Sequence, residues 1–291
     1  MIAVVFLVGL SSPLLVAQWC DGGSVIVLNS SADDFAPVWD RAGQRLLLSS
    51  TRRGESRIYT ASWHDTGWGT PQELDGLNPV GHHLSYTAPS PDGWLYLCRY
   101  RPGRRQAYLH IVRVRQGADR RWYWADVPEL VVGAEEAFTA HPTISPDGMT
   151  MVFASDRAGG QGGTDLWICY RSDDGHWTAP ESMRLLNSPG NEITPFLATA
   201  DTLFFASNGH GGAGGYDLFM SVRRWDGQWQ PPEPLVDLNT EADESDFSPL
   251  PFARGALFVR NSPGEGLNIF SAYLCGESQG LPIPRRMSKP E

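Results

Sequence analysis

The chain has 291 residues, with 33 acidic and 23 basic side chains and a formal net charge of −10. Hydrophobic residues make up 41% of it and charged residues 19%, a composition that excludes an intrinsically disordered chain and a long coiled coil. The 31 glycines, 22 prolines and 11 tryptophans favour many turns and short β-strands. The acidic balance argues against nucleic acid as a partner, because nucleic acid is bound by basic surfaces that release its counterions.

Residues 1–17 are predicted to be a signal peptide. The stretch from Ile2 to Val16 is almost wholly apolar, no charged side chain precedes Asp21, and Ala17 is a small residue suited to a cleavage site. The stretch is shorter than the roughly 20 apolar residues that span a bilayer, and Pro13 interrupts it. We therefore expect an exported protein of the periplasm or the periphery of the outer membrane, which does not span the membrane.

From about residue 25 to residue 274 the sequence consists of repeats. Residues 151–167 and 203–219 match almost position for position, at a spacing of 52 residues. A fixed period of this kind indicates a repeat architecture. The third residue of each copied apolar strand marks five repeats: Leu48, Leu97, Phe153, Phe205 and Phe258.

Each repeat is predicted to contain four strands. Two first strands end in a Ser-Pro-Asp-Gly turn, at residues 90–93 and 145–148, where proline presets φ and glycine accepts a positive φ. An apolar second strand, a glycine-rich loop, a third strand and a turn before tryptophan follow, and these lead into the fourth strand. Four strands in about 50 residues are typical of one blade of a β-propeller. Prolines recur in the first strands, at Pro37, Pro142, Pro195 and Pro249.

The second strands should supply the hydrophobic core, with side chains that alternate between the two faces of each blade. Cys98 and Cys169 fall in second and third strands of different blades and should be buried free thiols. The predicted core residues are Leu46, Leu48, Leu95, Leu97, Val152, Phe153, Leu203, Phe205, Leu257 and Phe258.

The chain is expected to be an all-β protein, a single five-bladed β-propeller with four antiparallel strands in each blade, over residues 18–275. Residues 25–29 align with residues 235–239, so the chain begins with a fourth strand and ends after a third strand. Residues 22–29 should therefore pair with residues 267–274 and complete the last blade. This closure by the N-terminal strand removes an exposed sheet edge.

A disulfide is predicted between Cys20 and Cys275. Antiparallel pairing of the two closing strands brings these residues within the roughly 4.4–6.8 Å Cα separation that a disulfide requires. Export would place the bond in an oxidising compartment, where it persists. Lipidation of Cys20 is the alternative, and Trp19 argues against it because lipidation signals have Gly, Ala or Ser before the cysteine. Residues 276–291 are predicted to be a disordered, proline-rich tail.

The third and fourth repeats resemble the TolB-type, WD40-like β-propeller repeat of bacterial envelope proteins. The resemblance rests on the Ser-Pro-Asp-Gly turn at 145–148, a strand ending Phe-Ala-Ser and the following Asp-Arg-Ala-Gly-Gly-Gln-Gly-Gly-Thr-Asp-Leu, and it covers about residues 25–274. Members of that family are mainly interaction scaffolds. The resemblance therefore implies a non-enzymatic, monomeric scaffold that binds an envelope protein, a peptidoglycan-associated partner or a ligand, with no catalytic residue.

Binding is expected on one face, where the loops that lead into the first strands meet the loops between second and third strands. Asp34, Glu192 and Asp246 are predicted to recur there by symmetry. Such residues either accept backbone hydrogen bonds or form an acidic funnel for a cation, a sugar or a basic segment. The candidate binding residues are Asp33, Asp34, His82, His83, Glu135, Glu136, Asp156, Arg157, Glu192, Asn208, His210, Asp243, Glu244 and Asp246.

No metal site and no cofactor are predicted. His82 and His83 are adjacent, so along a strand their side chains would point to opposite faces, and a His-x-x-x-His spacing does not occur. The glycine-rich loops at 159–163 and 211–215 lack the Lys-Ser/Thr of a phosphate-binding loop, and they are predicted to be tight connections that need a positive φ.

The alternative function is that of a glycoside-active enzyme, because five-bladed propellers also host glycosidases that use axial carboxylates. Such an enzyme needs two carboxyl groups about 5–9.5 Å apart, one of them with a raised pKa. Catalytic acids should be unique to single blades and lie deep in the axis. Because the acids found here repeat at symmetric loop positions, the sequence favours the scaffold.

Overall fold

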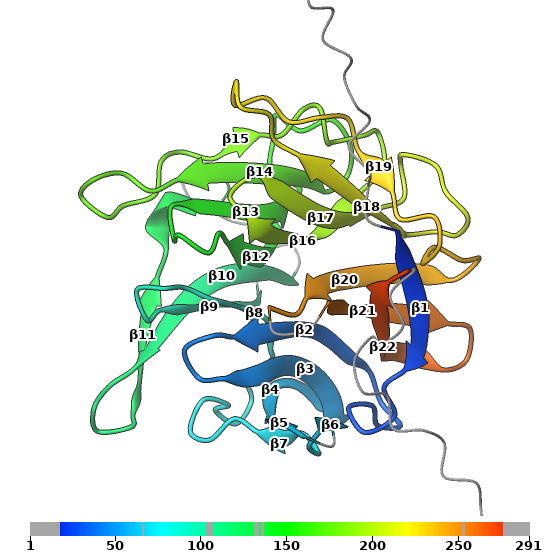
Figure 1. Ribbon diagram of the computed structural model, residues 1–291. Coiled ribbons are helices and arrows are strands. Elements are labelled where there is room, and N and C mark those ends of the chain that lie inside the picture. Colours follow the sequence, from blue (N-terminus) through cyan, green and yellow to red (C-terminus); the bar gives the residue numbers. More distant parts are fainter. Residues whose placement is uncertain are drawn as a thin grey trace, which may run out of the picture.

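The protein is a ring of five antiparallel sheets with four strands each, arranged around a central axis (Figure 1). The computed structural model describes residues 18–275, apart from residue 66 and the segments 103–106, 131–133, 135–136 and 252–253. The five-bladed propeller predicted from the repeats is confirmed. The predicted signal peptide at 1–17 and the predicted tail at 276–291 lie outside the described residues.

In each blade the strands follow one another outward from the axis. Blade one consists of β2 (Asp34–Asp40), β3 (Arg45–Arg53), β4 (Glu55–Ala61) and β7 (Gln72–Glu73). Blade two consists of β8 (Leu84–Pro89), β9 (Leu95–Pro102), β10 (Ala107–Gln116) and β11 (Trp122–Asp126). Blade three consists of β12 (Thr139–Ile144), β13 (Thr150–Ser155), β14 (Asp165–Tyr170) and β15 (Glu181–Ser182).

Blade four consists of β16 (Glu192–Thr199), β17 (Thr202–Ser207), β18 (Asp217–Val222) and β19 (Glu233–Pro234). Blade five consists of β20 (Asp243–Pro249), β21 (Gly255–Ser262), β22 (Gly266–Leu274) and β1 (Trp19–Ser24). A small hairpin, β5 (Trp63–His64) with β6 (Gly67–Trp68), is inserted in blade one, and a 3-10 turn (Pro128–Leu130) follows blade two. No helix among the described residues is long and apolar enough to cross a membrane.

The N-terminal strand closes the ring as predicted. β1 pairs antiparallel with β22, and Cys20 forms a disulfide with Cys275 at a Cα–Cα distance of 5.3 Å. The closing strand was predicted at residues 22–29, which is too late in the sequence, because β1 ends at Ser24. The residues that follow form a turn, in which the N–H of Leu28 donates to the carbonyl of Val25. The covalent bond and the strand pairing therefore hold the same two ends of the ring together.

The hydrophobic core lies between neighbouring blades. Tyr96 of blade two packs in one cluster with Met151 and Phe153 of blade three, and Val152 on the other face of β13 packs with Leu203 of blade four. All ten predicted core residues are buried, and so are the free thiols of Cys98 and Cys169. Full burial of one such apolar side chain contributes about 1.5–3 kcal/mol, so each interface between blades carries a large share of the stability.

Three of the outer strands, β7, β15 and β19, are only two residues long. An asparagine in the following loop completes the hydrogen bonding of the neighbouring strand: Asn187 Oδ1 accepts from the N–H of Leu166, and its Nδ2 donates to the carbonyl of the same residue. Asn29, Asn78 and Asn239 do the same in blades five, one and four. One side chain thus replaces a continuation of the outer strand.

The glycine-rich loops pack against the backbone of the next blade. Gly159 and Gly211 have positive φ values of 98° and 79°, as predicted for these connections. A Cβ on Gly162 would lie 2.1 Å from the carbonyl oxygen of Gly190, so a side chain there would push the two blades apart. The loops are therefore structural contacts between blades three, four and five.

Candidate functional site

Every inner strand contains a β-bulge at the same level of the axis. The register between inner and second strand shifts at this point in all five blades. At each bulge a residue other than glycine has a φ between 47° and 56°, a left-handed conformation that is unfavourable for such residues. The five bulge residues are Ala36, Tyr86, His141, Thr194 and Asp246.

Three of the bulge residues accept a hydrogen bond from the next blade. The N–H of Thr194 donates to Nδ1 of His141 at 3.2 Å, and the N–H of Asp246 donates to Oγ1 of Thr194 at 3.2 Å. The N–H of Ala36 donates to Oδ2 of Asp246 at 3.3 Å. The side chains of blades three, four and five therefore join consecutive inner strands around the axis.

The other two N–H groups find an acceptor on the second strand of the preceding blade. Tyr86 donates to Oγ of Ser49 at 3.0 Å, and His141 donates to Sγ of Cys98 at 3.2 Å. Ser49 and Cys98 occupy the same position of the repeated strand motif. That position is apolar in the three blades whose bulge residue is itself the acceptor, as Ala154, Ala206 and Val259.

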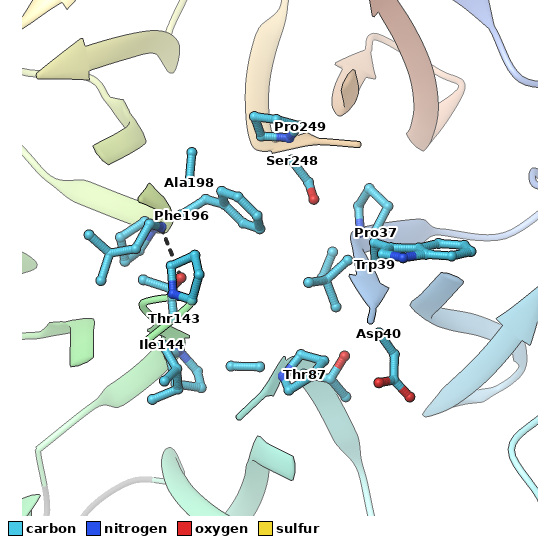
Figure 2. Close-up of a pocket in the computed structure, with 18 of the residues that line it drawn as sticks. Pro37, Trp39, Asp40, Thr87, Thr143, Ile144, Phe196, Ala198, Ser248 and Pro249 are labelled. Carbon is cyan, nitrogen blue, oxygen red and sulfur yellow. Dashed lines mark hydrogen bonds between the residues drawn. The ribbon is translucent and has the colours of Figure 1, made fainter. Parts of the chain in front are cut away.

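A cavity of about 550 Å³ lies on the axis and is lined by all five inner strands (Figure 2). Its lining runs from the five bulge residues to the turns between inner and second strands. The loops that lead into the inner strands, where binding was predicted, do not line it. The volume is within the range of small-molecule binding sites, so the cavity is the candidate functional site.

The wall of the cavity is mostly apolar. Trp39 and Phe196 supply aromatic surface, and Thr87 and Ser248 supply hydroxyl groups (Figure 2). Thr143 also lines it, and its Oγ1 accepts a hydrogen bond from the N–H of Leu197 at 2.9 Å. Prolines add rigid surface that has no N–H donor to satisfy; they are Pro37, Pro89, Pro91, Pro142, Pro146, Pro195, Pro249 and Pro251.

Three tryptophans of blade one form an aromatic cluster beside the cavity. The ring centroids of Trp39 and Trp68 are 6.2 Å apart, and those of Trp63 and Trp68 are 4.7 Å apart in an edge-to-face arrangement. Such pairs are favourable because the edge of one ring faces the electron-rich face of the other. The inserted β5–β6 hairpin thus holds the ring of Trp39 at the cavity wall.

Asp246 places a carboxyl group at the inner end of the cavity. Burial raises the pKa of this carboxyl to about 7, although hydrogen bonds from the N–H of Ala36 and the hydroxyl of Ser245 favour the charged form. The raised pKa favours the protonated form of Asp246 near neutral pH. The protonated carboxyl can donate a hydrogen bond or a proton to a bound ligand.

His141 of blade three also lines the cavity, at the bulge of its own strand. Burial lowers the pKa of the imidazole to about 3, so the ring is neutral at physiological pH. Because Nδ1 accepts a hydrogen bond from Thr194, the ring hydrogen is assigned to Nε2. The ring of Tyr86 packs against it at a centroid distance of 4.0 Å. His141 therefore acts as a hydrogen-bond acceptor among the five bulge residues that surround the axis.

Asp40 is the second carboxyl group in the described part of the wall, at the outer end of β2. It accepts hydrogen bonds from the N–H groups of Ala42 and Gly43 at 3.1 and 3.0 Å, and it forms an ion pair with Arg45 at 3.1 Å. Ala36, whose N–H donates to Asp246, is four positions earlier in the same strand. At about 3.3 Å per residue the backbone of Asp40 lies roughly 13 Å from that of Ala36, toward the outer end of the cavity.

The predicted acidic face contains carboxylates that are already bound within the propeller. Asp34 forms an ion pair with Arg52, and Glu244 forms one with Arg260 at 2.7 Å. Glu192 accepts hydrogen bonds from two serine hydroxyls. All three acids are fully buried, and they fix the loops that lead into the inner strands. A binding role for this face stays a prediction.

Asp246 does not recur with these acids. Glu244 is paired opposite Arg260 in the same way as Glu192 is paired opposite Ser207, so Glu244 is the blade-five member of the set. The prediction of symmetry was wrong because it counted back from Pro249. In blade five the proline stands three residues after the bulge residue instead of one, so counting back from it gives a position two residues too late.

Five other candidates also make contacts within the fold. The side chains of Arg157 and His210 bind leucine carbonyl oxygens in the loops before inner strands, at 2.6 and 2.8 Å. Asp33, Asp243 and Asn208 accept hydrogen bonds from backbone N–H groups at 3.0, 3.0 and 2.7 Å. Each of these five residues, which the sequence analysis predicted to be on a binding surface, therefore has a partner within the propeller.

The remaining candidates either lie at the surface or fall outside the residues that the structure describes. His82, His83 and Asp156 are exposed, and His83 packs against a tyrosine ring at 5.7 Å. Glu135 and Glu136 lie outside the described residues. Within the described part of the chain, no three His, Cys, Asp or Glu side chains are grouped so that they could hold a metal ion.

Sequence reasoning missed most of the cavity wall. Among the predicted site residues only Asp246 lines it. The signal was present, since the residue before Pro37, Pro142 and Pro195 is in each case a bulge residue. A proline that recurs directly after a bulge in an innermost strand predicts rigid, inward-facing surface, whereas these prolines were interpreted only as part of the strand.

No family model matches the chain, and no curated protein matches its sequence. Solved structures match its fold. A thermostable family-43 glycoside hydrolase is 11% identical, with 89% of this chain and 98% of that chain covered and a TM-score of 0.58. An α-L-arabinofuranosidase from Lactobacillus brevis is 8% identical, with 85% and 92% covered and a TM-score of 0.53.

TolB from Acinetobacter baumannii is 15% identical, and the match covers 87% of this chain, with a TM-score of 0.48. The chain spans 57% of the length of that protein. TolB is thus among the similar structures, as the resemblance of the repeats implies, but a WD40-like family is not established. At these identities the comparisons show the fold alone.

The prediction that the protein is not an enzyme is contradicted. Both solved structures with a TM-score above 0.5 that are described above belong to glycoside-cleaving enzymes, and the match covers more than nine tenths of each. The inference from a repeat family to a non-enzymatic scaffold failed because one fold carries many functions. The fold is thus shared with glycoside-cleaving enzymes, and a non-enzymatic role no longer follows from it.

Proposed function

We propose that the protein is a glycoside-active enzyme that takes a saccharide into its axial cavity, with Asp246 as the proton donor. The observation that carries this proposal is a buried carboxyl group whose pKa is raised to about 7, in the wall of a cavity of about 550 Å³. A general acid works best when its pKa lies near the operating pH. Asp246 is also unique to its blade, which is what a catalytic acid requires.

The composition of the wall supports a saccharide as the ligand. A sugar presents both hydroxyl groups and apolar ring faces, and the cavity offers hydroxyl groups at Thr87 and Ser248 beside the aromatic surface of Trp39 and Phe196. The few polar groups fix the orientation of a ligand, while the apolar surface supplies most of the contact area. The Cys20–Cys275 disulfide supports an oxidising compartment as the place of action.

Asp246 would protonate the glycosidic oxygen as the bond between that oxygen and the sugar carbon breaks. The departing sugar leaves as an alcohol, water adds to the carbon that has lost it, and the proton released by that water returns to the Asp246 carboxylate. Asp40, at the outer end of β2, is held as a carboxylate by Arg45 and by the N–H groups of Ala42 and Gly43. Asp40 is therefore assigned to ligand binding at the outer end, and Asp246 to proton transfer.

The test is hydrolysis of a panel of 4-nitrophenyl glycosides and short oligosaccharides by the full chain. Asp246→Asn preserves size and can still accept the hydrogen bond from Ala36, but it removes the titrating proton. We expect activity to fall by about 10²–10⁴-fold in this variant, and wild-type activity to decline as the pH rises through about 7. Asp201→Asn, at an exposed turn, is the matched control.

Asp246→Asn with full activity would overturn the assignment of the proton donor. An absence of both turnover and saccharide binding in the wild type, measured by calorimetry over the same panel, would overturn the proposed function itself.

A further inference from the structure

Blade two carries an outer hairpin that the other blades lack. Its third and fourth strands, β10 and β11, have 10 and 5 residues, whereas the outer strands β7, β15 and β19 have two residues each. In Figure 1 this hairpin extends beyond the rim of the ring, at the lower left. Trp122 of β11 donates its ring N–H to the carbonyl of Asp75 at 3.0 Å, whereas Tyr123 and Trp124 are exposed.

The charge of this segment is opposite to that of the chain. Residues 94–126 contain eight arginines and two aspartates, a net charge of +6, in a protein of formal net charge −10. Five aromatic rings of that stretch, Trp94, Tyr100, Trp122, Tyr123 and Trp124, are at least partly exposed. A local excess of positive charge on an acidic protein raises the local concentration of anionic ligands.

Four side chains form one surface, here called the blade-two patch: Trp94, Arg113, Arg115 and Tyr123. The guanidinium carbons of Arg113 and Arg115 lie 4.7 and 5.8 Å from the centre of the Trp94 ring. Arg115 is directly opposite Tyr123 in the β10–β11 pair, so the two side chains are on the same face of the blade. The patch therefore alternates aromatic and cationic surface.

Among the described residues neither arginine of the patch forms an ion pair within 4.0 Å, although the charge of Arg113 helps to lower the pKa of Glu129. Nε of Arg113 is buried without a hydrogen-bond partner, and Arg115 is exposed. The nearby acids are bound elsewhere: Glu129 pairs with His176 at 2.8 Å, and Asp92 pairs with Arg171 at 2.6 Å. Arg115, which is exposed, is open to an external carboxylate, and the guanidinium of Arg113 adds positive charge beside it.

We propose that the blade-two patch binds an acidic polysaccharide, with uronate carboxylates on Arg113 and Arg115 and sugar rings on Trp94 and Tyr123. Arginine suits this ligand because its planar guanidinium binds a carboxylate with two hydrogen bonds and also stacks on aromatic rings. Nucleic acid is the competing polyanion, and the experiment below distinguishes it from an acidic polysaccharide.

The patch is separate from the axial cavity but adjoins its wall. The turn that contains Ser90 and Pro91, both of which line the cavity, leads directly into Trp94. A chain held on the patch would thus lie beside the cavity. The binding proposed here goes beyond the proposed glycoside activity and does not depend on it, since none of the four residues of the patch lines the cavity.

The experiment is affinity electrophoresis of the full chain through gels that contain polygalacturonate, with salt varied from low to physiological. Wild-type protein should be retarded, and the retardation should weaken as salt rises. Arg113→Gln/Arg115→Gln should weaken binding at least tenfold. Because Arg113 is partly buried, Arg115→Gln/Arg120→Gln, at two exposed positions, serves as a second variant and should also weaken binding.

The matched control is Arg223→Gln/Arg224→Gln, which removes the same charge from the corresponding strand end of blade four and should leave binding unchanged. Fully methyl-esterified polygalacturonate, which keeps the sugar backbone without the carboxylate, should not retard the protein. The proposal is overturned if wild-type protein is not retarded, or if the control variant weakens as much as the patch variants. Tighter binding of oligothymidylate or polyglutamate than of polygalacturonate would also overturn it.

Discussion

The backbone N–H of Thr194 donates a hydrogen bond to Nδ1 of His141 across the boundary between blades three and four, at 3.2 Å. The donor and the acceptor belong to equivalent β-bulges, and both residues have left-handed backbones. The hydrogen bond therefore joins two residues whose left-handed backbone conformation is unfavourable for residues other than glycine. The acceptor must be a neutral imidazole, which makes the contact sensitive to pH.

Opposite pH dependences are expected for His141 and Asp246. The pKa of His141 falls from 6.5 to about 3 on folding, so its contribution to stability is full above pH 6.5 and is lost as the pH falls toward 3. The pKa of Asp246 rises from 3.8 to about 7, so its contribution is full below pH 3.8 and is lost as the pH rises through 7. Between about pH 4 and 6.5 the two effects oppose each other.

Single variants should separate the two effects in urea unfolding at a series of pH values. Relative to wild type, Asp246→Asn should gain stability as the pH rises from 4 to 7, and His141→Asn should lose it from 4 to 6.5. Each difference should approach about 1.4 kcal/mol per pH unit at most. Asparagine tolerates the left-handed backbone at both sites. Parallel curves for both variants and wild type would contradict the assignment.

Ser49→Ala should destabilise the protein by about 1–3 kcal/mol, because it leaves the N–H of Tyr86 without its acceptor. In blades three to five the side chain of the bulge residue accepts this hydrogen bond from the next blade. Ala36→Asn would supply the same kind of acceptor to the N–H of Tyr86, and asparagine suits a left-handed backbone. The double variant should recover most of the loss in denaturant unfolding. Ser62→Ala, at an exposed position in blade one, should be neutral. A double variant no more stable than Ser49→Ala would refute the exchange of acceptors.

Removal of the disulfide by Cys20→Ser/Cys275→Ser should lower the free energy of unfolding by on the order of 4–5 kcal/mol in the chain-entropy model. The two residues are 255 apart in sequence, so the bond closes nearly the whole described chain. Denaturant titration of both forms measures the effect. Mass spectrometry of the unreduced protein should find peptides joined through residues 20 and 275. A stability equal to that of wild type would mean that β1 pairing alone closes the ring.

The thiols of Cys98 and Cys169 should resist alkylation in the folded protein. Burial raises the pKa of each thiol to about 12, and the reactive form is the thiolate. Iodoacetamide at pH 8 should label them only after unfolding, as followed by intact mass. Rapid labelling of either cysteine under native conditions, with the Cys20–Cys275 bond intact, would show that the second or third strand opens locally.

The fold was predictable because the repeats record it directly. The series from Leu48 to Phe258 marks the second strand of each blade, and the positions of Cys20 and Cys275 follow from how the first and last repeats complement each other. The position of β1 was less accessible. Its Trp19–Ser24 segment differs from the two-residue outer strands of blades one, three and four, so alignment to the repeat could not locate it.

The site was harder to predict than the fold because the same residue type serves two purposes. Asp34 and Asp246 are both buried aspartates near the start of an inner strand, but Asp34 has Arg52 as a partner, whereas Asp246 has only hydrogen bonds and a cavity. Asp34 lies two positions before the bulge of its strand, whereas Asp246 is itself the bulge residue. Bulges leave no mark in a hydrophobic pattern, so the inward-facing set was misassigned.

The bond between Cys20 and Cys275 makes the described polypeptide a covalent circle in which no loop is uniquely a beginning or an end. A protease that cuts one surface loop between them produces a linear molecule and releases no fragment, so the blades stay at high effective concentration for resealing. New termini placed at the β10–β11 turn should likewise give a foldable circular permutant once the old ends are joined. Only a second cut, or a reductant combined with one, separates the ring into pieces.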